Sequence, residues 1–146
     1  MKYDKETFRE VLEPHHRTYW KIAYKKLQRK MQSLKSSLKK RSEDSQVLFD
    51  IEMDELREMF YNSYGDGCKY CDKKMTLKNI VCDHIIPLAK DGNSVIDNLQ
   101  LICKSCNTRK GPLDEDEFKY LMEWVECLKD ETKEYVLRKL AKGGRY

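Results

Sequence analysis

The chain has 146 residues, of which 37% are charged and 40% hydrophobic, and its formal net charge is +4. This length allows a single compact core and excludes two full domains. No apolar run approaches the ~20 residues that cross a bilayer, so the composition argues against a membrane-spanning protein and a membrane partner. The first five residues lack the apolar stretch of a secretory signal, and we therefore expect a cytoplasmic protein.

Positive charge is concentrated near the N-terminus. Residues 14–42 contain ten Lys or Arg and no Asp or Glu, so the rest of the chain is net acidic. A concentrated basic segment attracts polyanions, and counterion release makes such binding strong at low salt. The alternative is a solvated helix face that binds nothing, and charge alone does not separate the two.

Two amphipathic helices are predicted first. Residues 4–13 place Phe8, Val11 and Leu12 on one face, and Pro14 ends or kinks this helix. Residues 15–40 have apolar side chains at spacings of three and four, which predicts a long helix. The apolar residues of that long helix are Tyr19, Ile22, Ala23, Leu27, Met31, Leu34 and Leu38. Residues 42–46 are predicted to be a polar link.

Short elements follow in the middle of the chain, and helices return at the end. We expect strands at 47–51, 80–86 and 99–102, a loop at 87–96, and helices at 53–62, 106–110, 115–128 and 131–140. The pattern predicts a small α+β protein. Its expected regions are a basic helical part at 1–46, a core at 47–112 and a helical part at 113–146.

Four of the six cysteines form two Cys-x-x-Cys pairs, Cys68/Cys71 and Cys103/Cys106. Each pair presents two thiolates on a tight turn, and two such turns supply four sulfurs for a tetrahedral zinc site. Disulfides are the alternative in a secreted chain, but the paired spacing without a secretory signal favours metal. We expect a closed, structural zinc site, with Cys82 as a small buried side chain and not a fifth ligand.

Three further motifs lie around these cysteine pairs. They are Asp83-His84-Ile85-Ile86-Pro87, Asn98-Leu99-Gln100-Leu101 and Asn107-x-x-Lys110-Gly111. With the cysteines, they make residues 68–111 resemble the zinc-containing form of the HNH endonuclease family, because several short motifs occur in the family's order with plausible gaps. The resemblance implies a ββα-metal, treble-clef-like core, in which two short strands and a helix surround one catalytic divalent ion. The helices on either side lie outside the resemblance.

The resemblance also implies roles for four residues. Hydrolysis of a phosphodiester needs an activated water and a charge-neutralising ion on the phosphate. An imidazole with an ordinary pKa of ~6.5 suits the first task, and the resemblance makes His84 the general base. Asp83 and Asn107 offer hard oxygen ligands for Mg²⁺ or Mn²⁺, and the resemblance assigns them to that ion. Asn98 supports His84 through a hydrogen-bonded loop, while Asn93 is typical of a turn.

Strand geometry leaves the arrangement of this centre open. Neighbours on an extended strand point to opposite faces, so Asp83 and His84 cannot both face one side of a regular strand. Either a strand end or a bulge brings them to one centre, or they engage the metal from one side and the water from the other.

Five basic residues are candidate nucleic-acid contacts, and beside a nuclease-like centre the basic segment favours nucleic acid as its partner. They are Arg109 and Lys110 after Asn107, and Lys21, Lys25 and Arg29 on the long helix. For the first two, simple solvation is a nearly equal alternative. We expect Tyr19 to pack in the core, although aromatic side chains among basic ones can also stack on bases.

These features predict a metal-dependent endonuclease that hydrolyses DNA phosphodiester bonds in a bacterial or phage-infected cell. One alternative is a non-catalytic, zinc-stabilised module that binds nucleic acid through the basic helix. The other is a nuclease subunit that is active only in a larger phage packaging or restriction assembly. The chain could accordingly form a homodimer or bind a phage or bacterial partner protein. The placement of Asp83 and Asn107 with His84 argues against a pure binder.

Overall fold

The computed structural model describes residues 2–142, beginning with two helices. α1 spans Lys5–His16 and is capped by Asp4, whose carboxylate accepts the Thr7 N–H at 2.9 Å. The helix ends at His16, before Arg17 with its positive φ of 51°, and not at Pro14. Pro14 lies in the last turn of α1, where few helical bonds remain for it to disrupt. A short 3₁₀ turn, η1 (Arg17–Tyr19), leads into α2.

α2 spans Trp20–Ser45, so it begins and ends five residues later than its hydrophobic pattern predicts. The predicted polar link is wrong at its start, because Ser42 is a buried residue of the last helical turns. The buried stripe consists of Trp20, Ala23, Tyr24, Leu27, Met31 and Leu38. Tyr19 lies off this stripe and is 69% exposed, so the prediction that it is a core residue is also wrong.

Four short strands form two separate two-stranded sheets. β1 (Phe49–Asp50) pairs in parallel with β3 (Ser94–Val95). β2 (Ile80–His84) pairs antiparallel with β4 (Leu99–Cys103). β2 ends two residues earlier than its composition predicts. The Ile85 N–H still donates to the carbonyl of Asn98, its partner in the register, at 2.9 Å, but the Ile86 N–H donates to the Asn98 side chain instead. Two 3₁₀ turns, η2 (Leu88–Lys90) and η3 (Ile96–Asn98), shape the connection from β2 to β4.

Four further helices lie within the described residues 2–142. They are α3 (Met53–Ser63), α4 (Lys104–Lys110), α5 (Glu115–Glu126) and α6 (Asp130–Ala141). α4 follows β4 directly, two residues earlier than expected, because the Cys103 sulfur caps it by accepting the Cys106 N–H. α5 begins with a capping box in which the side chains of Asp114 and Glu117 each accept the other residue's backbone N–H.

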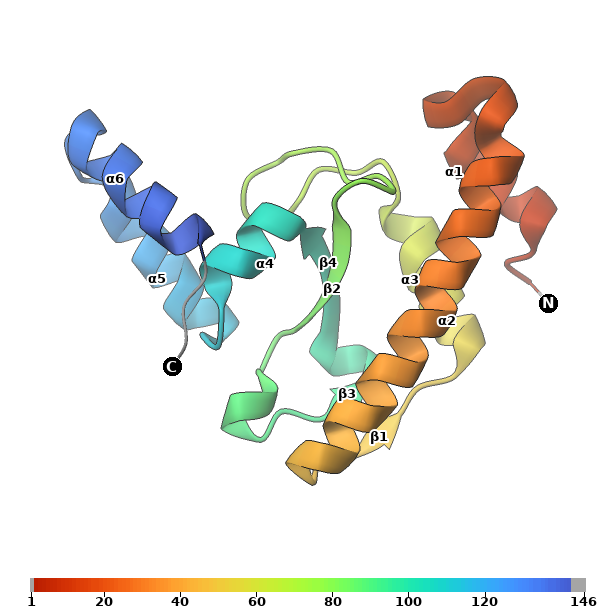
Figure 1. Cartoon of the computed structure of the whole chain (residues 1–146), viewed down its shortest axis with the longest axis horizontal. Helices are drawn as coiled ribbons and strands as arrows, with labels where there is room; N and C mark the ends of the chain where they lie inside the picture. Colours follow the sequence, from red (N-terminus) through yellow and green to blue (C-terminus); the bar gives the residue numbers. More distant parts are fainter. Residues whose placement is uncertain (1, 143–146) are drawn as a thin grey trace.

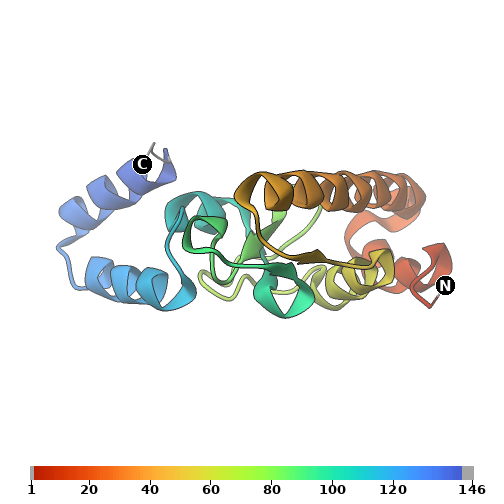
Figure 2. The ribbon, with the colours of Figure 1, turned by 90° about the horizontal axis from the view of Figure 1, so that it is seen from below.

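The strands lie in the middle of the molecule between helices (Figure 1). Seen from below, α2 runs along one side and α3 along the other, while α5 and α6 lie at the end opposite the N-terminus (Figure 2). One hydrophobic cluster joins α1 and α2, through Phe8 and Leu27, to Ile80, Ile102 and the buried cysteines. The mixed α+β class is thus confirmed, and the N-terminal helices share a core with the cysteine-bearing segment.

No helix in the part of the chain that the structure describes combines the length and apolar character needed to cross a bilayer.

Candidate active site and metal centre

The four paired cysteines come together in space. Their Sγ atoms all lie within 4.8 Å of one another, and Cys71 Sγ is 3.5 Å from Cys103 Sγ. A tetrahedral zinc ion with Zn–S bonds of ~2.3 Å separates its sulfurs by about 3.8 Å, so this cluster fits zinc with little adjustment. Cys82 is not part of the cluster. The predicted four-cysteine site is therefore present, and it ties the turn after α3 to the junction of β4 and α4.

Backbone N–H groups point at the sulfurs. Cys68 Sγ accepts the Cys103 N–H at 3.4 Å, and Cys103 Sγ accepts the Cys106 N–H at 3.4 Å. Burial by itself raises the pKa of Cys68, but the backbone donors from Cys103, Tyr70 and Cys71 outweigh it and lower that pKa below its ordinary value. Such donors stabilise the thiolate, which is the form that binds zinc.

Asp83 lies on one face of the β2–β4 pair, opposite Gln100 in the register. Its Oδ2 accepts a hydrogen bond from Gln100 Nε2 at 2.9 Å and forms an ion pair with Lys110 Nζ at 2.9 Å. Lys110 also donates to the His84 carbonyl oxygen at 3.1 Å. The carboxylate is nearly buried and the Lys110 side chain completely so. A cation therefore already lies against Asp83, supplied by α4.

This geometry corrects one prediction. The sequence places Lys110 among the nucleic-acid contacts or in solvent, yet its ammonium is inside the protein. Lys110 ends α4, and the helix packs against β2, so the side chain reaches a carboxylate and a carbonyl that satisfy it.

His84 is the last residue of β2 and is only 7% exposed. Its Nε2 lies 2.8 Å from the hydroxyl of Ser94 in β3. Burial lowers the pKa of His84 below its ordinary value, the charges of Arg41 and Lys110 lower it further, and Asp83 offsets part of this. The imidazole is therefore neutral near pH 7, which is the state a general base requires.

Asp83 and His84 contact different groups on opposite faces of β2. Pairing with β4 is unbroken from Ile80 to His84, so no bulge turns the two side chains to the same side. His84 is the last residue of the strand, however, and two residues beyond it the Ile86 N–H turns to the side chain of Asn98. A group bound at that end can be approached from both faces.

Asn107 is half-buried on α4, three residues before Lys110. Residues three apart lie on the same side of a helix. Because the Lys110 side chain reaches Asp83, the face of α4 that carries Asn107 is turned toward β2.

Asn98 fastens the loop that follows His84. Its Oδ1 accepts the Ile86 N–H at 2.8 Å, and its Nδ2 donates to the carbonyl oxygens of Ile86 at 3.0 Å and Asn93 at 2.7 Å. Asn93 itself lies in a turn, where its side chain accepts the Leu48 N–H at 3.1 Å. The two ends of the 87–93 segment are thereby held together, close to the strand end.

Two serines at this site have no counterpart among the residues expected from the sequence. Ser94 contacts the His84 ring, and Ser42 of α2 contacts Ser94 at 2.6 Å. The burial of Ser42 could have been predicted from the hydrophobic pattern, because Ser42 lies four residues after Leu38 on the buried stripe of α2. A hydroxyl on such a stripe needs a buried partner.

The basic candidates on α2 gather at one groove. Lys21, Lys25 and Arg29 are all exposed and line a groove of about 420 Å³ with Lys5. Arg109 on α4 is half-buried, and its Nε is buried without a hydrogen-bond partner.

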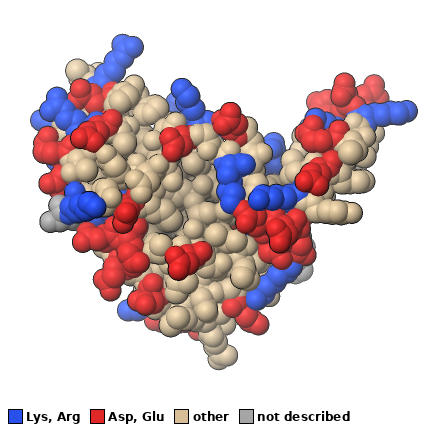
Figure 3. Space-filling view, turned by 180° about the vertical axis from the view of Figure 1, so that it is seen from behind, with Lys and Arg blue, Asp and Glu red and all other residues tan. Residues whose placement is uncertain are grey.

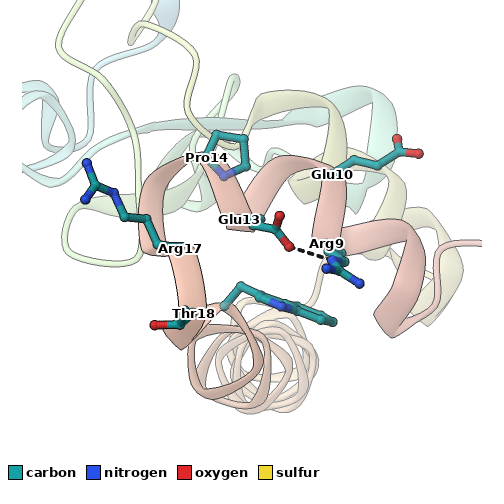
Figure 4. A pocket seen from close by; sticks show the side chains of 7 residues that line it. Arg9, Glu10, Glu13, Pro14, Arg17 and Thr18 are labelled. Carbon is teal, nitrogen blue, oxygen red and sulfur yellow. Dashed lines mark hydrogen bonds and ion pairs between the residues drawn. The ribbon is translucent and has the colours of Figure 1, made fainter.

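The cavity beside α1 and the rear face of the molecule lack the concentrated positive charge of the α2 groove. A cavity of about 740 Å³ lies between α1 and the start of α2, where the ion pair of Arg9 with Glu13 crosses its wall (Figure 4). Its lining balances two carboxylates, Glu10 and Glu13, against Arg9 and Arg17, so it lacks the excess of positive charge found in the α2 groove. The face seen from behind carries interspersed acidic and basic side chains, whereas the basic α2 crosses the front of the molecule (Figures 1 and 3).

A comparison with protein families agrees with this geometry. Residues 68–113 match the family model described as HNH endonuclease, and the match contains both cysteine pairs, β2, β4 and α4. No curated protein matched the chain. The family suggests nuclease activity and implies a nucleic-acid substrate. Over residues 68–113, about a third of its length, the chain therefore matches an HNH endonuclease domain.

Proposed function

We propose that this protein is a metal-dependent endonuclease that hydrolyses DNA phosphodiester bonds at the end of β2. The observation that carries the proposal is the position of His84. It is a neutral, buried imidazole that ends the strand bearing Asp83, and α4 packs against that strand with Asn107 on the facing side. A phosphate at the strand end would lie within reach of both faces.

The two kinds of metal site have different donors. The four cysteines suit a closed, structural zinc ion, whereas the oxygens of Asp83 and Asn107 suit one Mg²⁺ or Mn²⁺ ion. Such an ion, when bound, neutralises charge on the scissile phosphate and stabilises the leaving oxygen. Two protein ligands leave coordination positions for water and phosphate oxygens. The carboxylate of Asp83 would be shared with Lys110, or released by it, on binding.

The protein's own groups then divide the remaining work. His84 accepts a proton from the attacking water, and Asn98 holds the loop beside the strand end so that the ring keeps its place. Arg109 is the candidate phosphate contact on α4 and would act through its terminal guanidinium nitrogens, because its Nε is buried.

The test is cleavage of supercoiled plasmid by zinc-loaded protein, with Mg²⁺ or Mn²⁺ added or withheld. Nicked or linear product that depends on the added ion supports the proposal. DNA binding without cleavage in either ion contradicts it and favours the non-catalytic binding module.

Replacing Asn98 with Ala removes three hydrogen bonds of the loop beside His84. We expect the cleavage rate to fall about 10–100-fold, as is usual when a residue that orients an active group is lost. Initial rates of plasmid nicking measure the effect, and Asn93→Ala, which loses one hydrogen bond of the same loop, serves as the comparison. An equal fall of the cleavage rate in both variants would show that Asn98 has no specific role in positioning His84.

Replacing Lys110 with Met leaves the carboxylate of Asp83 buried without its ion-pair partner. We expect the free energy of unfolding to fall by about 3–5 kcal/mol, because an uncompensated buried charge is costly. If Asp83 is a ligand of the divalent ion, millimolar Mg²⁺ should recover part of this loss. Urea unfolding with and without Mg²⁺ measures both effects. Lys104→Met, an exposed position on the same helix, is the control, and equal stability of the two variants would contradict the prediction.

Replacing Lys21, Lys25 and Arg29 together with Gln should weaken DNA binding at every sequence. Deleting α2 is not a usable test, because its buried stripe belongs to the core. If all three side chains contact phosphates, the slope of log affinity against log salt should fall by about 2.7. Fluorescence anisotropy over a salt series measures this. The control replaces Lys133, Arg138 and Lys139 of α6 with Gln, an identical change of charge, and an equal effect in both triples would exclude the α2 groove.

A further inference from the structure

Three buried polar groups form a chain of hydrogen bonds that ends on the backbone of α2. His84 Nε2 lies 2.8 Å from Ser94 Oγ, Ser94 Oγ lies 2.6 Å from Ser42 Oγ, and Ser42 Oγ lies 2.6 Å from the Leu38 carbonyl oxygen. Both serines are fully buried. Figure 1 shows why they meet, since the C-terminal half of α2 lies beside β1 and β3.

The direction of these hydrogen bonds follows from counting protons. A carbonyl oxygen can only accept, and each hydroxyl has one proton to give. The contact with Leu38 therefore uses the proton of Ser42, and the contact between the two hydroxyls then uses the proton of Ser94. The remaining contact has a proton only if His84 Nε2 supplies it.

Any other distribution of the hydroxyl and ring protons leaves one of these three contacts without a proton between its two atoms. If Ser94 donated to the ring, Ser42 would have to donate both to Ser94 and to Leu38, which one proton cannot do. The cost of leaving such a buried contact unmade is about 1–3 kcal/mol. One direction alone, from His84 through both hydroxyls to Leu38, satisfies all three contacts.

We propose that Ser42 and Ser94 fix His84 as the tautomer with its proton on Nε2, so that Nδ1 carries the lone pair and is the basic atom of the nuclease site. This inference rests on the proposed function and adds to it. Ser42 lies outside residues 68–113, so α2 contributes a positioning residue to a site that the HNH domain does not complete by itself.

The proton balance of the step is simple. Nδ1 takes a proton from water as the water oxygen bonds to phosphorus and the bond from phosphorus to the leaving oxygen breaks. The leaving oxygen takes a proton from solvent. The Nε2 proton stays on Nε2 throughout, hydrogen-bonded to the Ser94 hydroxyl, so the ring does not rotate when it becomes an imidazolium.

The tautomer can be read without any cleavage assay. Zinc-loaded full chain with ¹⁵N-labelled histidine is recorded by two-bond ¹⁵N–¹H correlation at about pH 8, where an ordinary imidazole is neutral. The signals of His84 are those that His84→Gln removes. We expect a protonated Nε2 and an unprotonated Nδ1 in the wild type, and exchange-averaged nitrogens in Ser94→Ala. A protonated Nδ1 in the wild type would overturn the proposal.

Kinetics provide the second readout. Ser42→Ala and Ser94→Ala should each lower kcat about 10–100-fold with KM and zinc content unchanged. Ser94→Thr keeps the hydroxyl on a strand that tolerates β-branching, and it should restore most of the rate. Ser37→Ala, at an exposed position of the same helix, is the matched control.

The two readouts separate the two hypotheses. Equal kcat for Ser42→Ala and Ser37→Ala, with the wild-type tautomer kept in both, would overturn the role of Ser42. A wild type that shows the Nε2 proton but no cleavage would contradict the proposed nuclease activity and leave the hydrogen-bond chain established.

Discussion

Replacing His84 with Ala is expected to lower the rate of plasmid cleavage by about 10²–10⁴-fold, the usual contribution of a positioned general base. Burial, followed by the charges of Arg41 and Lys110, lowers the pKa of His84. The ring at the end of β2 is therefore neutral and can accept a proton. The measurement is the initial rate of nicking in Mg²⁺ and in Mn²⁺, with DNA affinity measured separately by anisotropy. We expect the affinity to change little, because an uncharged buried ring contributes little to phosphate binding.

The matched control for this variant is His15→Ala. His15 is an exposed histidine on α1, so its loss tests whether removal of any imidazole slows the reaction. Zinc content and far-UV circular dichroism of both variants verify the fold. Equal cleavage rates for wild type and His84→Ala would refute the assignment of His84 as the base, whatever the role of the divalent ion.

Replacing Cys103 with Ala is expected to abolish zinc binding and cooperative unfolding together. Structural zinc sites in small peptides have apparent binding free energies of about 10–16 kcal/mol, while whole domains are stable by only about 5–15 kcal/mol. Cys103 lies in the buried cluster, ends β4 and caps α4 with its sulfur. Its loss therefore affects the metal, the strand pairing and the helix start at once. Metal analysis of purified protein and thermal unfolding by circular dichroism measure the result.

Cys127→Ala is the control for this prediction, because Cys127 is exposed and lies outside the four-sulfur cluster. We expect it to keep one zinc ion per chain and the wild-type melting temperature. A Cys103→Ala variant that melts cooperatively at the wild-type temperature without zinc would show that the hydrophobic cluster suffices to hold the fold.

The ion pair of Asp83 with Lys110 connects stability to the proposed chemistry. The pair buries a carboxylate that the resemblance assigns to the divalent ion, and the ammonium satisfies it when that ion is not bound. Buried ion pairs are weak evidence for stability by themselves, since desolvation offsets much of their attraction. A Lys that can yield its place to a divalent ion gives this pair a functional reason to exist.

Much of the domain could be predicted from local sequence. The two Cys-x-x-Cys pairs determine four thiolates on two turns, and zinc geometry then requires those turns to meet, as Cys71 and Cys103 do. The helices and the other strands follow from hydrophobic period, but β3 at Ser94–Val95 lies in a segment predicted to be a loop. Most other errors are at boundaries, for example residues 42–45 of the predicted polar link, which continue α2 because Ser42 satisfies its hydroxyl inside the core.

What the sequence by itself determined is the set of chemical groups: four sulfurs, one imidazole, and the oxygens of Asp83, Asn98 and Asn107 in a recognisable order. Only the tertiary structure decided their partners. It placed Lys110 on Asp83, 27 residues away in the chain, and Ser94 on His84, 10 residues away. It also placed Ser42 on Ser94, 52 residues away. The physical reason is that spacing along the chain determines which side chains share a face of one helix or strand. The partner across the interface depends on how separate elements pack to bury their apolar faces, and a buried polar group then bonds to whatever that packing brings within reach.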